Sequence, residues 1–376
     1  MGKASDQFDN HGREKIQCKL CSKWFHRLDV HLGGSHGIAP DAYLEKFPGS
    51  ELVSAYIKAE FYKGSEEETE SKEVGPLPFR FGVAELRMRE GLAPEDQVFV
   101  PLHDEGWHVG KCEKDHLESL ALGIQDDQNV LIVGPPGVGK TTLARELAAI
   151  VGQPIRRFPF HGEMRVGDLI GSKELVTDSK TKHSVTRFDE GPFLLAARRG
   201  HWFLADEFDS APPPVTFLLH SALERPRQLT VQGVEVEFSP EFRFIATANT
   251  LGYGDDSGLY AGTGPMNEAL LDRFGVVLRV DYPMRDDEIK ILTARTAVDE
   301  KWATGMVSIA NSVREAQRNH TTLVSMSPRR LVMWAAMAKR MNSVHKAAKL
   351  AVTNKLPPDD SQFIAGLIQR TFGSGT

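Results

Sequence analysis

The sequence has few cysteines and no long apolar run. Its 376 residues include only three cysteines, Cys18, Cys21 and Cys112, and the first two form a CxxC pair, so we exclude a disulfide framework and expect a reducing compartment. No stretch of about 18 apolar residues occurs, and the polar start MGKASDQFDNHGREK lacks the apolar core of a signal peptide. We therefore expect a cytoplasmic protein without a membrane partner.

The sequence also lacks an excess of positive charge. Its 45 lysines and arginines stand against 51 acidic residues, which gives a formal net charge of -6. Because neutralisation of phosphates dominates nonspecific DNA binding, any contact with DNA must be local. The hydrophobic share of 41% and the charged share of 26% are typical of a folded globular protein, and the length predicts two or three domains.

Composition and periodicity change along the chain and predict four regions. Short apolar runs such as NVLIVG, HWFLADE and FRFIATAN alternate with helix-length segments, which is typical of a parallel sheet flanked by helices. After Tyr282 only helical spacing remains, which predicts an α-helical lid. We expect a Cys/His-rich module over residues 1–60, an acidic linker and lead-in over 61–95, an α/β core over 96–285 and the helical lid over 286–376.

A phosphate-binding loop is predicted at the start of the α/β core. The segment GPPGVGKT at 134–141 follows the apolar run LIV, opens a helical segment and matches G-x4-G-K-[ST]. Its backbone N–H groups can cradle a phosphate chain, while Lys140 reaches the β- and γ-phosphates and the Thr141 hydroxyl holds Mg²⁺. An incidental glycine-rich turn is the alternative, but it leaves the strand and helix unexplained. The predicted phosphate-binding residues are Gly134, Pro135, Pro136, Gly137, Val138, Gly139, Lys140, Thr141 and Thr142.

Two acids end the apolar run WFLADE about sixty residues later. Phosphoryl transfer at such a loop needs one carboxylate near the metal and one near the attacking water. We assign Asp206 to the magnesium and nucleotide site, and Glu207 as the general base. A solvated acid pair at a strand end is the alternative.

Polar residues in three later segments are further candidates. Asn249 ends the run FRFIATAN, and its amide can donate to the γ-phosphate and accept from the attacking water; a turn-capping asparagine is the alternative. Arg273, in LLDRF, is expected at the domain edge, where it can reach the γ-phosphate of a neighbouring subunit. The segment SPRR begins a lid helix at Ser327, which fixes an arginine near the nucleotide. For both arginines a surface salt bridge is the alternative.

In this order, GPPGVGKT, FLADEFD, FIATAN, LLDRF and SPRR resemble the Walker A, Walker B, sensor 1, arginine finger and sensor 2 motifs of AAA+ ATPases. The segment EGPFLLAARRGHWFLADEFDSAPPPVTFLLHSALE is similar to the MoxR/CobS branch, which includes the ATPase subunit of aerobic cobaltochelatase. The resemblance extends from about Phe79 to Val352. It implies Mg²⁺-dependent ATP hydrolysis in a ring, usually a hexamer, in which Arg273 completes the next subunit's site and Arg329 is the sensor 2 arginine.

The same resemblance implies two insertions that face the partner or the pore in relatives. One is expected within 167–188. The other is a β-hairpin, for which the alternating segment 229–238 fits, with Gln232 and Gly233 near its turn. A plain solvent-exposed hairpin is the alternative.

The N-terminal module carries a predicted metal site. Cys18-x2-Cys21-x9-His31-x4-His36 supplies two thiolates and two imidazoles, the ligand set of a closed tetrahedral Zn²⁺ site, whereas unrelated cysteines and histidines are the alternative. The spacing and the continuation HGIAPDAYLEKFP resemble the prokaryotic Ros/MucR zinc finger, whose members bind DNA. Residues 1–60 nevertheless contain eight basic and eight acidic residues, so a protein-docking module is equally consistent.

One group of basic residues in the module keeps DNA binding open. Lys15, Lys19, Lys23 and Arg27 are spaced so that they could form one basic face. We therefore consider several functions. The leading one is a ring ATPase that remodels a protein client, such as one with a von Willebrand A-like domain, and is targeted by the finger. The rivals are a DNA-directed motor of phage or defence type, a genuine cobaltochelatase subunit, and a nucleotide-gated scaffold with little turnover.

Overall fold

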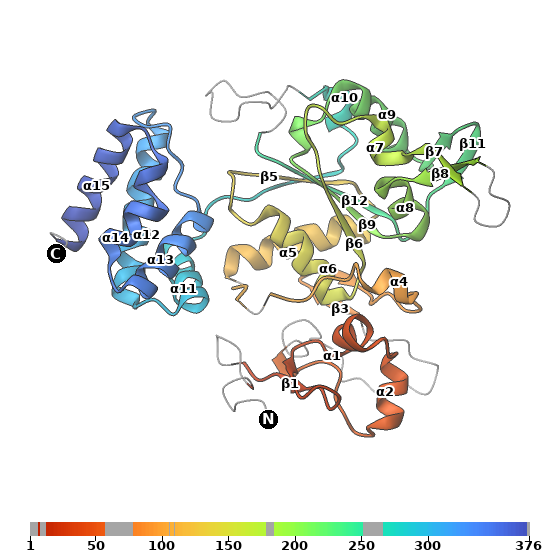
Figure 1. Ribbon diagram of the computed structural model, residues 1–376, viewed down its shortest axis with the longest axis horizontal. Coiled ribbons are helices and arrows are strands. Elements are labelled where there is room, and N and C mark those ends of the chain that lie inside the picture. Colours follow the sequence, from red (N-terminus) through yellow and green to blue (C-terminus); the bar gives the residue numbers. More distant parts are fainter. Residues whose placement is uncertain are drawn as a thin grey trace.

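The computed structural model describes residues 7, 13–56, 78–104, 106–108, 110–177, 184–250 and 266–373. Figure 1 shows the N-terminal module below a central α/β body, with the C-terminal helices beside that body. Residues 61–77 of the predicted acidic linker and lead-in lie outside the described residues. Among the helices of the described ranges, none combines the length and apolarity needed to cross a membrane.

The central body is built on a five-stranded parallel sheet with the order β13-β5-β12-β9-β6. Its strands in chain order are β5 (Val130–Val133), β6 (Ile155–Pro159), β9 (Trp202–Asp206), β12 (Arg243–Ala248) and β13 (Val276–Arg279). β5 and β9 are buried along their whole length, as their continuous apolar runs predict. The predicted parallel sheet is therefore confirmed. β6 was not expected, because its sequence IRRFP carries two arginines.

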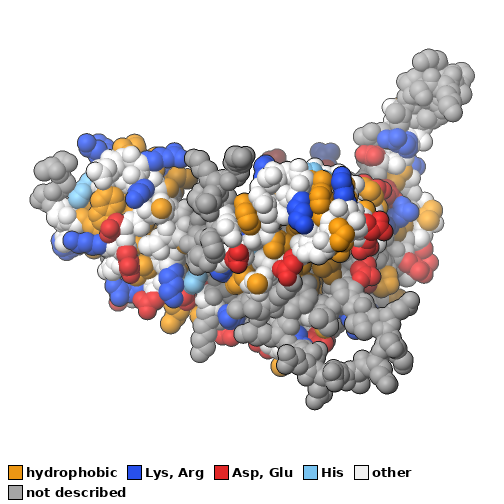
Figure 2. Space-filling model, turned by 90° about the horizontal axis from the view of Figure 1, so that it is seen from below, with side chains coloured by type: hydrophobic (Ala, Val, Ile, Leu, Met, Phe, Trp, Pro, Cys, Tyr) orange, Lys and Arg blue, Asp and Glu red, His pale blue; other side chains and the backbone are white. Residues whose placement is uncertain are grey.

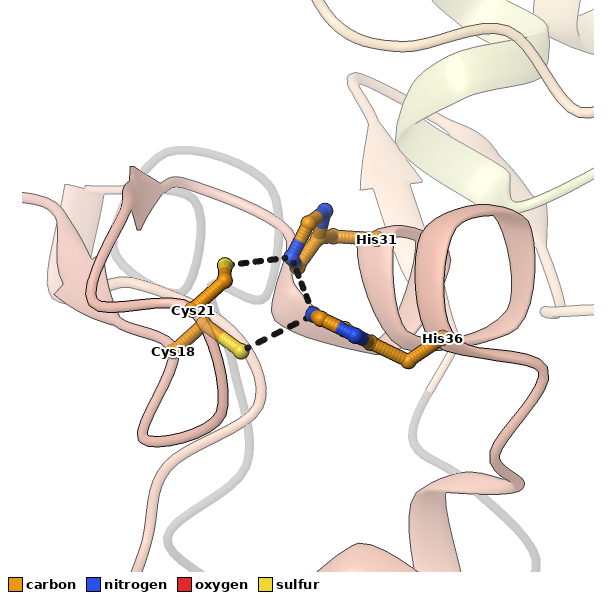
Figure 3. A group of neighbouring side chains, drawn as sticks. All are labelled: Cys18, Cys21, His31 and His36. Carbon is orange, nitrogen blue, oxygen red and sulfur yellow. Dashed lines mark hydrogen bonds between the residues drawn. The ribbon is translucent and has the colours of Figure 1, made fainter.

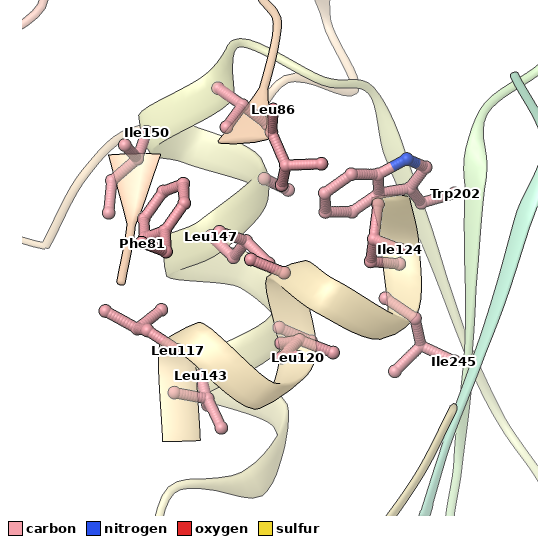
Figure 4. Packing of buried hydrophobic residues seen from close by; sticks show 14 of the residues in the cluster. Phe81, Leu86, Leu117, Leu120, Ile124, Leu143, Leu147, Ile150, Trp202 and Ile245 are labelled. Carbon is pink, nitrogen blue, oxygen red and sulfur yellow. The ribbon is translucent and has the colours of Figure 1, made fainter. Parts of the chain in front are cut away.

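Helices cover both faces of the sheet. On one face α5 (Lys111–Gln125) and α6 (Lys140–Val151) pack Leu120, Ile124 and Leu147 against Ile245 of β12 (Figure 4). On the other face an apolar cluster with many phenylalanines lies between the sheet and three helices, α7 (Val166–Ile170), α8 (Pro192–Arg199) and α9 (Pro213–Leu223). This three-layer arrangement buries both sides of the sheet and brings the carboxyl ends of its strands to one open edge.

Three antiparallel hairpins extend this body. The first, β3 (Phe79–Phe81) with β4 (Ala84–Leu86), packs on α5, so the end of the lead-in belongs to the core. The second, β7 (Gly171–Thr177) with β8 (Ser184–Glu190), lies in the segment expected to hold an insertion. The third, β10 (Gln228–Val231) with β11 (Val234–Glu237), confirms the predicted hairpin, and Gln232 and Gly233 turn it with positive φ angles of 54° and 81°.

The C-terminal region is entirely helical within its described residues, as predicted. It contains α11 (Arg285–Thr296), α12 (Glu300–Arg318), α13 (Pro328–Met341), α14 (Val344–Ala351) and α15 (Pro358–Phe372). These helices share an apolar core around the fully buried Trp334. A buried ion pair between Arg314 of α12 and Glu288 of α11, with a 2.6 Å N–O distance, joins the first two helices.

The N-terminal module is small. It contains β1 (Ile16–Gln17), β2 (Trp24–Phe25), α1 (Leu28–His31), the π-helical turn η2 (Leu32–His36) and α2 (Pro40–Lys46). Among the described residues of the module, its own apolar cluster has four buried members, Cys18, Leu28, Leu32 and Tyr43. We expected a module tethered by a linker, but its described residues pack directly on the α/β body, since Val53 belongs to the body's apolar cluster.

Candidate functional site

The predicted phosphate-binding loop joins β5 to α6 at the carboxyl edge of the sheet. Gly139 lies directly before Lys140, the first residue of α6, and has a φ of 105°. A residue with a side chain would be strained in this conformation. Gly134 also has no room for a side chain, because a Cβ there would lie 1.9 Å from the carbonyl oxygen of Val280. The loop therefore presents the N-terminal end of α6 to this edge, where a phosphate is favoured.

Lys140 is buried at the centre of this edge. Its Nζ donates to the carbonyl oxygens of Gly134 at 2.6 Å and Pro135 at 3.0 Å, and to Oδ1 of Asn249 at 2.9 Å. Burial lowers the pKa of Lys140 to about 8, although the nearby carboxylates, Asp209 first among them, act in the opposite direction. The ammonium and the amide of Asn249 thus meet at the position that the sequence predicts for the γ-phosphate.

This lowered pKa predicts that ATP binding depends on pH. The charged ammonium attracts phosphate, and it is lost as the pH rises through about 8, so the ATP affinity should fall by up to tenfold per pH unit above that value. A titration with a fluorescent ATP analogue between pH 7.5 and 9.5 measures this. Lys140→Arg stays charged throughout and should give a flat profile. A flat profile for the wild type would contradict the prediction.

The hydroxyl of Thr141 and the carboxylate of Asp206 lie side by side, as a shared magnesium ion requires. Thr141 Oγ1 donates to Asp206 Oδ1 at 2.9 Å, and Arg157 Nε donates to Asp206 Oδ2 at 2.8 Å. Burial alone would raise the pKa of Asp206, but hydrogen bonds from Thr247, Arg157 and Thr141 outweigh it and the pKa lies below its usual value. An ionised carboxylate beside a hydroxyl is a donor set that suits Mg²⁺.

Glu207 and Asp209 follow in the same segment and differ in environment. Glu207 is exposed, has a φ of 57°, and its backbone N–H donates to Thr247 Oγ1 at 3.2 Å. Asp209 is buried, and its Oδ2 accepts the backbone N–H groups of Asn249 at 2.9 Å and Thr250 at 3.0 Å. The Glu207 side chain is therefore accessible to water, whereas Asp209 fixes the end of β12 that leads into Asn249.

Sequence reasoning missed both Asp209 and Arg157. Asp209 had a signal, since it is the third acid of FLADEFD. Arg157 had none, because only the pairing of β6 with β9 brings it to Asp206.

A cleft of about 470 Å³ lies beside the loop, between the sheet edge and the helical region. Gly137, Gly139 and Thr142 line it from the loop side, and Tyr282 and Arg329 line it from the helical side. The cleft has the size of a small-ligand site and adjoins the phosphate-binding edge.

Comparisons with known proteins agree with this geometry. A family model for the AAA domain of the dynein-related subfamily matches residues 129–274, and a CbbQ/NirQ/NorQ C-terminal model matches residues 288–371. The aerobic cobaltochelatase subunit CobS of Sinorhizobium sp is 30% identical over 302 residues, which cover 77% of this chain and 90% of that relative. The chain belongs to the MoxR/CobS-type AAA+ ATPases. AAA+ ATPases generally bind ATP and Mg²⁺, and they commonly form rings.

Two further similarities are more partial. An uncharacterized protein of Staphylococcus haemolyticus is 37% identical to this ATPase over 158 residues, which cover 42% of the chain and 56% of that relative. A solved structure of a Thermotoga maritima RuvB mutant has 18% identity and a TM-score of 0.44, and covers 70% of this chain and 78% of its own.

The two arginines predicted to act on the nucleotide lie in different places in the ATPase. Arg329 is exposed and lines the cleft, where its Cβ would lie 3.4 Å from a Cβ added to Gly137. Arg330 instead donates to the carbonyl oxygen of Ser325 at 2.9 Å. Arg273 is 24% exposed, and it donates to Glu224 Oε2 at 2.9 Å and to the carbonyl oxygen of His220 at 2.9 Å, both on or next to α9.

The four predicted metal ligands of the ATPase converge in the N-terminal module (Figure 3). Cys21 Sγ lies 3.2 Å from His31 Nε2, Cys18 Sγ lies 3.6 Å from His36 Nε2, and the two Nε2 atoms are 3.1 Å apart. A tetrahedral Zn²⁺ site with ordinary bond lengths places its ligand atoms about 3.3–3.8 Å apart. Burial, aided by His36 and Lys23, lowers the pKa of His31 to about 4, which keeps the imidazole in its neutral, ligating form. The donor set fits Zn²⁺, and the three separations lie within a few tenths of an ångström of that range.

The expectation that Lys15, Lys19, Lys23 and Arg27 form one basic face of the module is wrong. Arg27 is only 4% exposed and Lys15 only 7% exposed, because both lie inside the fold, whereas Lys19 and Lys23 are exposed. The sequence spacing placed these four residues close together but could not show that the ATPase body covers the segment around Arg27. Half of the proposed DNA-binding charge is therefore unavailable to a ligand.

Proposed function

We propose that this ATPase hydrolyses Mg²⁺-bound ATP in a ring of identical subunits, a hexamer by analogy with the family, to remodel a protein partner. The observation that carries the proposal is the convergence of Lys140, Thr141, Asp206 and Asn249 at one edge of the sheet. Mg²⁺ would neutralise charge on the β- and γ-phosphates. Lys140 would hold those phosphates, and Thr141 and Asp206 would hold the metal.

The remaining polar residues take the other steps of hydrolysis. We assign Glu207 to polarise the attacking water, since it is exposed beside Asp206. Asn249 would orient that water toward the γ-phosphate, because its amide both donates and accepts. Arg329 would contact the nucleotide from the helical side of the cleft, and Arg273 would serve the site of the next subunit.

Two hairpins support a protein client. Leu175 of the β7–β8 hairpin is 79% exposed, and Val234 of the β10–β11 hairpin is 64% exposed. Exposed apolar side chains on projecting hairpins suit contact with a polypeptide. We propose that these hairpins bind a protein client, and that this client contains a von Willebrand A-like domain.

The N-terminal module would hold Zn²⁺ through Cys18, Cys21, His31 and His36, and would help to target the ATPase. A protein target is favoured over DNA, because Lys15 and Arg27 are buried. Lys, Arg, Asp and Glu side chains are also interspersed over the described residues of the face in Figure 2, which offers duplex DNA no broad positive surface.

This preference predicts that DNA does not stimulate hydrolysis. The ATPase rate of the full chain should stay within about twofold when duplex DNA is added at low salt, where phosphate contacts are strongest. A coupled phosphate-release assay measures the rate. Stimulation that disappears in Cys18→Ser would instead establish the DNA-directed motor.

A metal-chelatase subunit is the second candidate, because the chain covers 90% of the Sinorhizobium CobS. The test is cobalt insertion by the Sinorhizobium enzyme in which this chain replaces CobS. Activity above that of the enzyme without CobS would favour this candidate.

A further inference from the structure

The N-terminal module contacts the far end of the helix that begins at the phosphate site. Arg27 lies in the segment between the metal ligands Cys21 and His31 and is only 4% exposed. Its Nη1 donates to the carbonyl oxygen of Ala149 at 3.1 Å and also to that of Ile150. Both carbonyls belong to the last turn of α6, whose 12 residues start at Lys140. One helix thus has the phosphate site at its N-terminal end and the module at its C-terminal end.

The guanidinium of Arg27 is held in place from several sides. Asp29 of the module accepts from Nε at 2.8 Å and from Nη2 at 2.6 Å. The guanidinium also lies 5.6 Å from the ring centroid of Phe79. At Gly152, which ends α6, an added Cβ would lie 3.0 Å from Nη2 of Arg27. The contact is therefore close, buried and dependent on the fold of the module.

A second contact reaches the same helix. His26 of the module lies with its ring centroid 6.0 Å from that of His103, and Nδ1 of His103 lies 2.6 Å from Oε2 of Glu146 in α6. Both side chains of the His103–Glu146 pair are at most 5% exposed. Val53, which follows the metal-binding segment, adds an apolar contact by joining the cluster that includes α5 and α6. The module thus contacts α6 both through a cap on its last carbonyls and through neighbouring side chains.

We propose that the N-terminal module is a metal-dependent brace for the phosphate-binding helix, in which Zn²⁺ bound by the four ligands fixes Arg27 against α6 and thereby strengthens ATP binding. The proposal rests on the Zn²⁺ site proposed above. The apolar cluster that the described residues of the module form has four buried members, one of which is the ligand Cys18, so the metal supplies much of the module's folding free energy. Loss of the metal removes the support for Arg27.

The cap acts on α6 for a plain electrostatic reason. The last four carbonyl groups of a helix have no partner within it, and a cation there stabilises the helix terminus. When Arg27 leaves, the last turn of α6 is expected to fray, and the apolar contacts of Leu147 and Ile150 that orient the helix weaken. The amides at its other end then lose their fixed direction toward the phosphates. Arg27 is a positioning residue, since it does not contact the nucleotide site.

The test compares ATP binding by the full chain with and without zinc. Wild type loaded with Zn²⁺ should bind a fluorescent ATP analogue at least about fivefold more tightly than protein stripped by a chelator, a typical size for coupling between sites. Linkage requires the reciprocal effect, so saturating ATP should tighten Zn²⁺ binding by the same factor. Equal ATP affinity of the two forms, with one Zn²⁺ bound per chain in the loaded form, would overturn the brace but leave the zinc site standing.

Substitutions separate the cap from general folding. Arg27→Ala should retain one Zn²⁺ and bind ATP at least about fivefold more weakly than the wild type. Removal of the metal by the chelator should then lower its ATP affinity little further, because the substitution and the loss of metal disrupt the same contact with α6 and their effects are not additive. Arg27→Lys should recover part of the affinity, since an ammonium also donates to carbonyls. Lys46→Ala removes an exposed cation of α2 and should match the wild type. Independent, multiplicative effects of Arg27→Ala and of metal removal would overturn the proposal. A wild type that binds no zinc would overturn the proposed metal site as well.

Discussion

Lys140→Ala is expected to bind ATP at least about 100-fold more weakly than the wild type. The ammonium of Lys140 donates to two phosphates in the proposed complex, and each charge-assisted hydrogen bond contributes about 1.5–3 kcal/mol. Two such bonds correspond to a factor of about 100 or more in the dissociation constant. Titration with a fluorescent ATP analogue at pH 7.5, below the pKa of about 8, measures the loss while the wild-type lysine is mainly charged.

Folding is controlled for by thermal unfolding and by a matched variant. Without nucleotide, Lys140→Ala should melt close to the wild type, because burial of a charged amine is costly and its removal is tolerated. ATP should raise the melting temperature of the wild type but not that of the variant. Lys339→Ala removes an exposed lysine of α13 and should leave ATP binding unchanged. Tight binding by a well-folded Lys140→Ala would contradict the assignment of the phosphate site.

The sheet and the phosphate-binding loop could be predicted from the sequence because their signals are local. The run LIV before GPPGVGKT specifies a buried strand, a turn that needs glycine and a helix start within 15 residues of one another. Asp206 and Asn249 follow equally plain apolar runs, and parallel strands bring their carboxyl ends to one edge. The four Cys and His residues were also found by spacing alone, and they lie together.

Other features depend on tertiary contacts and left no local signal. β6 carries the polar pair Arg156 and Arg157, which its edge position tolerates, and the same position brings Arg157 to Asp206. The burial of Arg27 depends on residues about 120 positions away in α6. A charged residue in a short polar segment is ordinarily exposed, so the sequence around Arg27 predicted a basic surface. Only the packing of the module on α6 turns that arginine inward.

Arg273→Ala is expected to keep ATP affinity within about twofold and to lower the maximal hydrolysis rate about 1,000-fold, the loss typical of a missing arginine finger. Within its own subunit Arg273 contacts Glu224 and the carbonyl oxygen of His220, not the loop that holds ATP. Its effect on turnover should therefore come from contact with the γ-phosphate of the ATP that a neighbouring subunit binds. Glu224→Gln removes the ion pair but not the arginine, and it should keep near wild-type turnover. ATP binding and steady-state phosphate release measure the two effects.

A mixing experiment distinguishes action on a neighbour from support of the arginine's own subunit. Glu207→Gln subunits should bind ATP without cleaving it, yet they carry an intact Arg273. In mixed rings they would place that arginine at the sites of Arg273→Ala subunits, which keep their own Glu207. Phosphate release should then rise well above the sum of the two inactive proteins and be greatest near equal proportions. If Arg273 only supports α9 within its own subunit, mixing restores nothing, because each Arg273→Ala subunit keeps its defect whatever its neighbour.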